Sequence, residues 1–279
     1  MPKLYRTREG DATAVDTRTQ LTTVGSETAP GPLLVPQGMS HIVGVIIAAS
    51  ENFAAATSYS GFIRLEGPGL KNGPESLACI AGGTPVATGG NGVSYGREIK
   101  VNFPVIPGNE VLIFGEMAGT DIGAVTFVVT LVFADKAGGE GKVHRTFTVE
   151  GDITAADTKT LLTTQGSVTA PSPVVPSDVT KIDKIIFAAA SEGLADGKQG
   201  WFLRLGGNAV MNGEQVIAIS ASGRIAVQAG SDAAPQICEA LVLEDVDIEV
   251  RPSDTISVAV EGAGDDTGTG RAVVTLVYA

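Results

Sequence analysis

The sequence predicts an all-β protein made of two tandem eight-stranded antiparallel sandwiches, jelly-roll-like in architecture and derived from an internal duplication. Three observations lead to this prediction. The apolar stretches are short, rich in β-branched residues and bounded by Gly, Pro, Asn and Asp. None of them shows the 3.6-residue period of an amphipathic helix. The same segments also occur twice in the same order: VVTLVFA at 128–134 returns as VVTLVYA at 273–279.

The repetition extends along the whole chain of 279 residues. Each repeat is the size of a common single domain. We therefore expect a first sandwich at 1–136, a Gly-rich linker at 137–142 and a second sandwich at 143–279. The matching segments are 10–32 with 151–173, 41–49 with 181–189, 62–65 with 202–205, and 106–123 with 251–268.

The order of the elements follows from their turn residues. The stretch APGPLLVP (29–36) cannot be a central strand, because proline donates no ladder hydrogen bond, so it should cross between the two sheets. Asn72-Gly73 supplies the positive φ of a tight reversal after the fourth strand. In IPGNE (106–110) the proline sets up the turn before the seventh strand. VVTLV is apolar on both faces, which predicts a central strand covered on both sides.

The equivalent signals in the second half predict the same eight strands. The strands expected in the first half are 4–8, 16–24, 41–49, 60–66, 76–81, 97–105, 109–117 and 124–134. Those expected in the second half are 144–149, 157–165, 181–190, 200–206, 214–221, 239–250, 254–261 and 270–278.

Side-chain alternation in FIRL places Phe62 and Arg64 on one face of their strand. Arg64 can pair with Glu116, reach a neighbouring subunit, or lie in solvent with its stem over the phenylalanine. Arg204 has the same alternatives, with Glu261 as the candidate partner.

Composition limits the classes of function. Charged residues make up 18% of the chain, against about 25% in typical domains. Either the surface is a neutral one rich in Gly, Ala and Thr, or much of it is covered by partner subunits; we favour the second, because interface cores are poor in charge. The net charge of −12 without a basic run disfavours direct nucleic-acid binding and attachment to anionic lipid. The start of the sequence has no apolar signal-peptide core, and the longest apolar runs fall short of the roughly 20 residues of a membrane span, so we expect neither secretion nor membrane insertion.

Residues and motifs typical of catalytic or metal sites are scarce. We therefore expect that the protein is not an enzyme, has no cofactor, and has no catalytic, cofactor-binding or metal-ligating residue. His41 and His144 occupy non-equivalent positions, and GxSxG is absent. Cys79 and Cys238 are also non-equivalent and read as buried thiols. The acidic loops 116–123 and 261–268 either bind Ca²⁺ or form solvated hairpin tips.

A further acidic run, LEDVDIE at 243–249, is expected to place Asp245, Asp247 and Glu249 on one solvent-facing side of a strand. A charged strand face of this kind discourages pairing with a strand of another molecule.

The paired turns PGNEV (107–111) and PSDTI (252–256), each followed by a VVTLV[FY]A strand, resemble the double jelly-roll major capsid proteins of the adenovirus-like virus lineage. The resemblance is architectural and covers the whole chain, although the halves are short for that lineage and unusually alike. It implies a structural virion protein, made in the host cytoplasm, that self-assembles into a shell through pseudo-hexameric homotrimers and contacts other shell proteins. The alternatives are a capsid decoration or cement protein and a carbohydrate-binding, lectin-like module. Against the lectin, Trp201 aligns with Gly61, so no aromatic platform is repeated.

Overall fold

The computed structural model describes eleven stretches of the chain, and all secondary structure in them is β-strand. In this part of the chain no helix is long and apolar enough to cross a membrane. The described residues are 3–25, 30–52, 58–83, 94–119, 124–137, 142–153, 157–168, 171–191, 198–223, 236–264 and 270–279.

The first sandwich consists of two antiparallel sheets, which we call layers 1 and 2. Layer 1 has the strand order β1-β8-β3-β6, and layer 2 has the order β14-β5-β4-β7-β2. The strands of layer 1 are β1 (Lys3–Ala12), β8 (Ala124–Ala134), β3 (His41–Asn52) and β6 (Ser94–Pro104). Those of layer 2 are β14 (Gln236–Glu239), β5 (Glu75–Gly83), β4 (Ser58–Glu66), β7 (Leu112–Gly119) and β2 (Thr19–Gln20).

The second sandwich repeats this arrangement in layers 3 and 4. Layer 3 has the order β9-β18-β11-β15, with β16 also pairing β11, and layer 4 has the order β10-β17-β12-β13. The strands of layer 3 are β9 (Arg145–Ile153), β18 (Gly270–Tyr278), β11 (Lys181–Ser191), β15 (Leu241–Leu243) and β16 (Ile248–Glu249). Those of layer 4 are β10 (Thr160–Leu161), β17 (Ser257–Gly264), β12 (Lys198–Gly206) and β13 (Gln215–Gly223).

Both halves have jelly-roll topology. In the first half, one sheet has the order 1-8-3-6 and the other 2-7-4-5 when β1 to β8 are numbered along the chain. The second half has the same two orders when the short strands β14, β15 and β16 are counted together as its sixth strand. The predicted fold class is therefore confirmed. The origin of the likeness in a duplication, and the domain limits at 137–142, stay predictions; residues 138–141 lie outside the described part of the chain.

Two predictions about single segments can be compared with the structure. The proline-rich stretches near 30–36 and 171–176 form no strands and connect layer 2 to layer 1 and layer 4 to layer 3, as predicted. The strand expected at 239–250 is wrong, because it is broken into β14, β15 and β16. Asp245 and Asp247 have φ values of 53° and 48°, which interrupt the ladder, so these acids do not alternate on a strand face.

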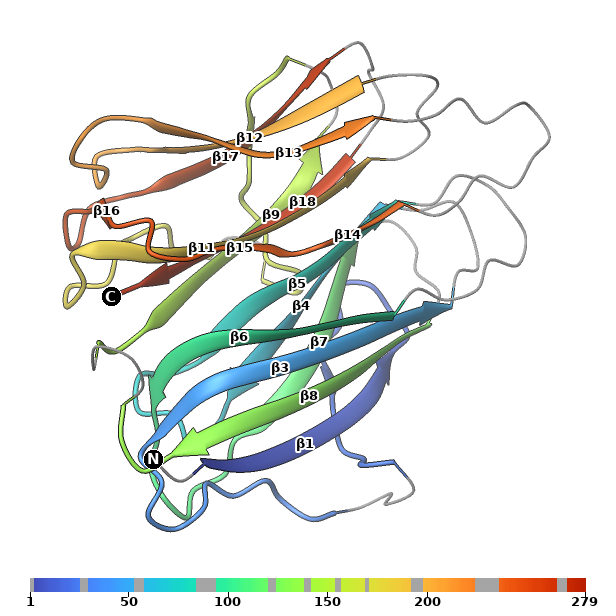
Figure 1. The fold of residues 1–279 in the computed structure, drawn as a ribbon, viewed down its shortest axis with the longest axis vertical. Coiled ribbons are helices and arrows are strands. Elements are labelled where there is room, and N and C mark those ends of the chain that lie inside the picture. The colour runs from blue at the N-terminus through green and yellow to red at the C-terminus, as the bar shows by residue number, and fades with distance from the viewer. Residues whose placement is uncertain are drawn as a thin grey trace.

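The four layers stack in the order 1-2-3-4, as Figure 1 shows from bottom to top. Strands β11 and β18 of layer 3 pack on β5 of layer 2. Four layer-3 residues, Ile186, Ala188, Val273 and Val277, consequently belong to the first hydrophobic core. The second core lies between layers 3 and 4 and includes Trp201, which is 4% exposed.

One strand links the two halves through its backbone. β14 belongs to the second half, yet it pairs with β5 from Gln236 opposite Gly83 to Glu239 opposite Ile80. The N–H of the next residue, Ala240, donates to the Cys79 carbonyl over 3.2 Å. Layer 2 is thus completed by a segment from the other half of the sequence.

The two cores differ by reciprocal changes of side-chain size. A Cβ on Gly115 would lie 2.5 Å from Cδ2 of Phe127. The equivalent positions in the second half are Val260 and Ala272, so the large residue has moved to the facing strand. Both of these residues are fully buried. The larger side chain of the two therefore lies on β8 in the first half and on β17 in the second.

The same reversal occurs around the tryptophan. A Cβ on Gly61 would lie 2.9 Å from Sδ of Met117. Their counterparts are Trp201 and Gly262, and a Cβ on Gly262 would lie 3.3 Å from the indole. Trp201 therefore fills the core volume that Met117 fills in the first half, which makes it a packing residue.

Candidate functional site

The contact between layers 2 and 3 is the most elaborate polar feature of the described structure. Two threonines of layer 3 cap the edge of β5 with a chain of hydrogen bonds. The Ala78 N–H donates to Thr275 Oγ1 over 2.8 Å, the two threonine hydroxyls lie 2.7 Å apart, and Thr148 Oγ1 donates to the Ser76 carbonyl over 2.9 Å. One N–H and one C=O of the part of β5 that extends beyond β14 are satisfied in this way without a further strand.

A buried ion pair lies beside this edge. Arg64 Nε donates to Glu116 Oε2 over 2.5 Å, and Glu116 is 0% exposed. Arg64 Nη2 also donates to the Gln165 carbonyl over 2.8 Å, and the Ser167 N–H donates to the other Glu116 oxygen. The guanidinium lies 5.3 Å from the ring centroid of Phe62. Of the three alternatives for Arg64, the structure shows the pair with Glu116, and the pair also holds a loop of the second half.

A second buried carboxylate belongs to the same contact. Glu150, 1% exposed, accepts hydrogen bonds from Arg271, from Thr164 Oγ1 at 2.6 Å and from the Gly166 N–H at 3.2 Å. Arg271 also donates to Asp152 over 2.6 Å. Glu116 and Glu150 are therefore each paired with an arginine and hydrogen-bonded, the condition under which buried ions are tolerated.

Glu75 is a third buried acid at this contact, and its ionisation is costly. Burial raises the pKa of Glu75 from 4.5 to about 7, although hydrogen bonds from the N–H and hydroxyl of Thr146 and the charge of Arg145 lower it. Both Thr146 groups donate over 2.7 Å. The equivalent residue in the second half is Gln215, an uncharged side chain of the same shape.

Replacing Glu75 with glutamine is expected to stabilise the protein by an amount that grows as pH rises. An acid with a raised pKa in the folded state destabilises that state relative to the unfolded one as pH rises, so the contribution of Glu75 to the free energy of unfolding should fall between about pH 4.5 and about pH 7. Glu75→Gln keeps an oxygen acceptor for Thr146 and should gain about 2–3 kcal/mol over wild type at pH 8, with no gain at pH 4. Urea unfolding at a series of pH values measures this difference.

The exposed Glu249→Gln variant is the control for this experiment, since it removes one charge without removing a buried one. His144 titrates in the opposite sense, because burial lowers its pKa to about 4. It is present in both proteins, so its contribution cancels in the comparison. A Glu75→Gln difference that is constant across pH would contradict the prediction.

The outer face of layer 1 repeats part of the set of residues that layer 3 buries against layer 2. The hydroxyls of Thr7 and Thr130 lie 2.8 Å apart, like those of Thr148 and Thr275. Both residues of the outer pair are half-buried, whereas Thr148 is 1% and Thr275 0% exposed. Three more half-buried residues have buried counterparts of the same type: Ile46 and Ile186, Ala48 and Ala188, and Val128 and Val273. VVTLV is therefore central in both sandwiches, as predicted, but the outer face of β8 is only partly covered.

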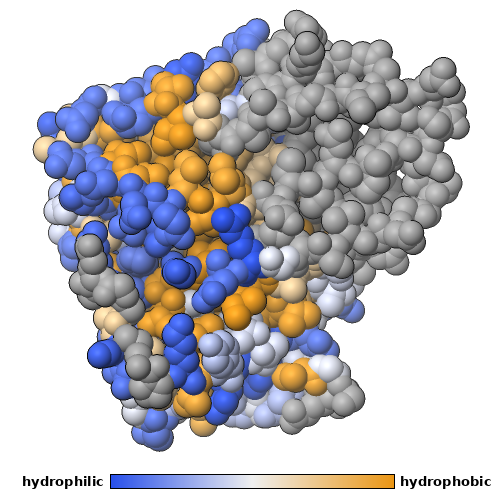
Figure 2. All heavy atoms as spheres, viewed as in Figure 1, coloured by the Kyte–Doolittle hydropathy of each residue, from blue (hydrophilic) through white to orange (hydrophobic). Residues whose placement is uncertain are grey.

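The outer face of layer 4 carries the counterparts of the layer 2 surface. β13 is an edge strand of its sheet, and Val216 on it is 50% exposed. Arg204 Nε donates to Glu261 over 2.6 Å, which confirms the predicted pair. The side chains of Arg204 and Glu261 are 26% and 17% exposed, whereas those of Arg64 and Glu116 are 8% and 0% exposed. Figure 2 shows apolar residues gathering over the second half on the face turned to the viewer.

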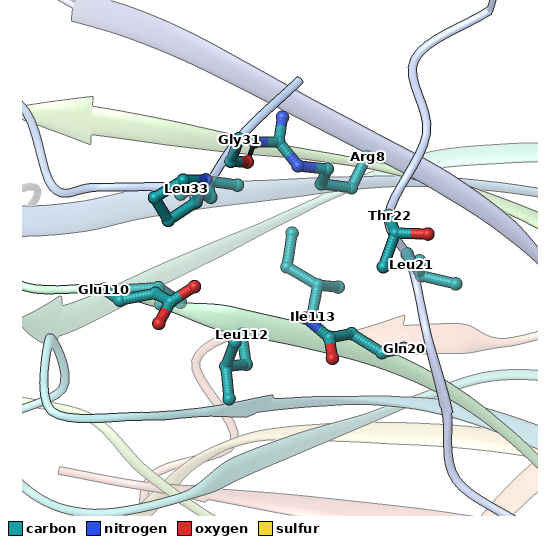
Figure 3. Close-up of a pocket in the computed structure, with 11 residues that line it drawn as sticks. Arg8, Gln20, Leu21, Thr22, Gly31, Leu33, Glu110, Leu112 and Ile113 are labelled. Atoms are coloured by element: carbon teal, nitrogen blue, oxygen red, sulfur yellow. Dashed lines mark hydrogen bonds between the residues drawn. The ribbon is translucent and has the colours of Figure 1, made fainter. Parts of the chain in front are cut away.

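A hollow of the first sandwich lies between β1, the start of β7 and the crossover after β2 (Figure 3). Arg8 forms one wall, and its guanidinium donates to the carbonyls of Thr7 at 2.8 Å and Gly31 at 2.9 Å. Arg8 thus braces the proline-rich crossover against β1. The second half has Val149 at this position, so the brace is not repeated.

The remaining sequence candidates are not gathered into one site. His41 opens β3 and lies 2.7 Å from the Ser40 hydroxyl, while His144 precedes β9 and lies 3.5 Å from Asp183. Among the described residues no group of three or more His, Cys, Asp or Glu side chains could hold a metal ion. Cys79 is a buried free thiol, as expected.

The acidic loops begin inside strands. Glu116 and Glu261 belong to β7 and β17 and are used in the ion pairs described above. The loop acids Asp121, Asp265 and Asp266 lie outside the described residues, so the calcium alternative stays untested.

The threonine pairs were missed by the sequence reasoning. A signal existed: each VVTLV strand carries a single hydroxyl in an apolar run, at the same place in both halves. The role of this hydroxyl could not be predicted, because its partner threonine lies 123 residues away in the first half and 127 residues away in the second.

No family model matches the sequence, and no curated protein matches it. Three solved structures are similar to it in architecture. A structure of PNGF-II has a TM-score of 0.43 and 10% identity over 98% of this chain and 65% of its own. A protein of an archaeal virus, described by its triple jelly-roll fold and turret assembly, has a TM-score of 0.23 and 13% identity over 98% of this chain and 56% of its own. The tandem CBM22-1–CBM22-2 domain of Paenibacillus barcinonensis Xyn10C has a TM-score of 0.26 and 11% identity over 99% and 92%.

This chain spans less than two thirds of the length of the first two structures, at 65% and 56%. With TM-scores below 0.5, likenesses of this strength support neither a family nor a function. The strand order within the chain itself defines the class: a protein of two jelly-roll sandwiches stacked face to face.

Proposed function

We propose that this protein is a structural subunit that assembles with copies of itself, as a virion shell protein built from trimers. The observation that carries the proposal is the repetition of the layer 2–layer 3 contact surfaces on the two outer flanks. Layer 1 presents the same kind of sheet as layer 3, and layer 4 the same kind as layer 2. Each chain therefore ends in two unlike flanks that match the two sides of its own internal contact.

Contacts between unlike surfaces join subunits head to tail. Such contacts close into a ring when the rotation at each contact divides a full turn, and otherwise continue as a filament. In a trimer of this chain, six similar sandwiches would meet through three internal contacts and three contacts between chains. This gives the pseudo-hexameric block from which a shell can be tiled. The low content of charge, 18%, fits surfaces that neighbours cover.

The shell role is favoured over carbohydrate binding by one residue. Trp201 is the single tryptophan of the chain, and it lies in the second core with 4% exposure. A sugar-binding platform needs its aromatic faces open to the ligand. A decoration protein on another shell would use the same flanks, and the closed ring formed by this chain alone distinguishes the main-shell role.

The mass of the purified protein in solution tests the proposal. Light scattering over a range of concentrations should give three times the mass of the 28.4 kDa chain, and electron microscopy of the same sample should show particles with six lobes. A monomer at every concentration up to about 1 mM, where only associations weaker than about 4 kcal/mol remain undetected, would contradict it.

A further inference from the structure

The free edge of β13 is the counterpart of the edge that the threonines cap inside the chain. Ala78 and Ser76 lie opposite Phe62 and Arg64 in the β4–β5 ladder. Ala218 and Val216 lie opposite Phe202 and Arg204 in the β12–β13 ladder. The register is the same, so the Ala218 N–H and the Val216 C=O point away from β12, as the capped groups of β5 point away from β4.

The hydroxyl pair of layer 1 has the geometry that capping requires. Thr7 and Thr130 are register partners in the β1–β8 ladder, and Thr148 and Thr275 are register partners in the β9–β18 ladder. Each pair lies on the outer face of its sheet at nearly the same spacing, 2.8 Å and 2.7 Å. In the inner pair, Thr148 Oγ1 donates to the Ser76 carbonyl, and Thr275 Oγ1 accepts from the Ala78 N–H. The outer pair has the same donor and acceptor directed away from the sandwich.

A second part of the contact is also duplicated. Inside the chain, the loop at Gln165-Gly166 lies on the Arg64–Glu116 pair, and Thr164 is bonded to Glu150. On the outer flank, Thr23 is bonded in the same way to Glu9 over 3.1 Å. The following glycine is left-handed in both loops, with φ of 54° at Gly25 and 51° at Gly166. As far as Gly25, the last described residue of this stretch, the outer loop therefore matches the loop that lies on the Arg64–Glu116 pair.

We infer that a second copy of this chain docks on layer 4, with its Thr7–Thr130 pair capping the β13 edge and its loop at Gly25 over the Arg204–Glu261 pair. The inference rests on the proposed function and names the residues that join one chain to the next. The occupant is another copy, because the outer face of layer 1 repeats the threonine pair and three apolar residues whose counterparts in layer 3 already fit this kind of edge. A foreign strand added to β13 is the alternative that the experiment excludes.

The test removes the two hydroxyl groups by substitutions that keep the branched shape of the threonine side chains. Thr7→Val with Thr130→Val should raise the dissociation constant of the assembly roughly 10- to 100-fold, because two edge groups are left without partners in the seam. Val216→Arg on the opposite flank should weaken assembly at least as much. Both proteins should keep the wild-type unfolding midpoint as monomers. Thr180→Val, at an exposed threonine outside both surfaces, is the matched control and should assemble like wild type.

Cysteine cross-linking identifies the occupant. A chain with Thr7→Cys mixed with a chain with Val216→Cys should form a disulfide-linked dimer, whereas either chain alone should give only the background of Cys79 and Cys238. An assembled wild type whose dissociation constant is unchanged in both seam variants would overturn the inference and leave the proposed function standing. A monomeric wild type would overturn both.

Discussion

Replacing Arg64 with alanine is expected to lower the free energy of unfolding by about 3–5 kcal/mol, because it leaves the Glu116 carboxylate buried without its counter-ion. Glu116 is 0% exposed, and the pair lies beneath the loop at Gln165. Arg64 is only 7% exposed, so water contacts only the edge of the pair. Urea unfolding of the monomer measures the loss, with the slope of the transition reporting whether the halves still unfold together.

The second half supplies the matched control. Arg204→Ala breaks the equivalent pair with Glu261, whose side chains are 26% and 17% exposed. Exposed pairs contribute about 0–1 kcal/mol, so the loss should be several-fold smaller in the monomer. In the proposed assembly Arg204→Ala should also weaken association, because the proposed contact between chains covers this pair. Equal losses for the two variants in the monomer would show that the internal contact does not bury Arg64.

Phe127→Ala is expected to cost about 3–5 kcal/mol, since it removes a fully buried ring from the first core. The second half shows how the cavity can be filled. There the equivalent of Phe127 is Ala272, and the equivalent of Gly115 is Val260. Adding Gly115→Val to Phe127→Ala should therefore recover at least about 1 kcal/mol.

Gly115→Val alone completes this double-mutant cycle. Its Cβ would lie 2.5 Å from the ring of Phe127, so the single variant should be destabilised by about 1–3 kcal/mol or more. The sign of the effect of Gly115→Val thus reverses with the residue at position 127. Losses that add without coupling would contradict the reciprocal packing of the two halves.

Most of the fold could be predicted because short-range patterns determine it. VVTLV is apolar on both faces and became β8 and β18, each the second strand of its sheet and flanked on both sides. The proline-rich segments could not pair and became crossovers. The break of the strand at 239–250 was not predictable from periodicity. The break coincides with the positive φ of Asp245 and Asp247, and Glu244 and Asp247 of this segment pair with Lys184 and Lys181 of β11.

The residue pairs of the candidate site could be predicted only where the second half of the sequence repeats the same two residues. Arg64 and Glu116 could be paired because Arg204 and Glu261 repeat them at the same places. The capping threonines could not, since a single hydroxyl in an apolar strand is ordinary until the stacking of layers 2 and 3 is known. Stacking is a tertiary property, and no local pattern encodes which outer face meets which edge.

The crossing of β14 into layer 2 has a consequence for synthesis on the ribosome. About 100 residues separate the end of β8 from β14, which at about 5–20 residues per second corresponds to roughly 5–20 s of translation. During that interval the nascent first half exposes the edge of β5 with neither its fifth strand nor its threonine cap. The growing chain must reach its final third before that edge is closed, and neighbouring nascent copies on one messenger could compete for it.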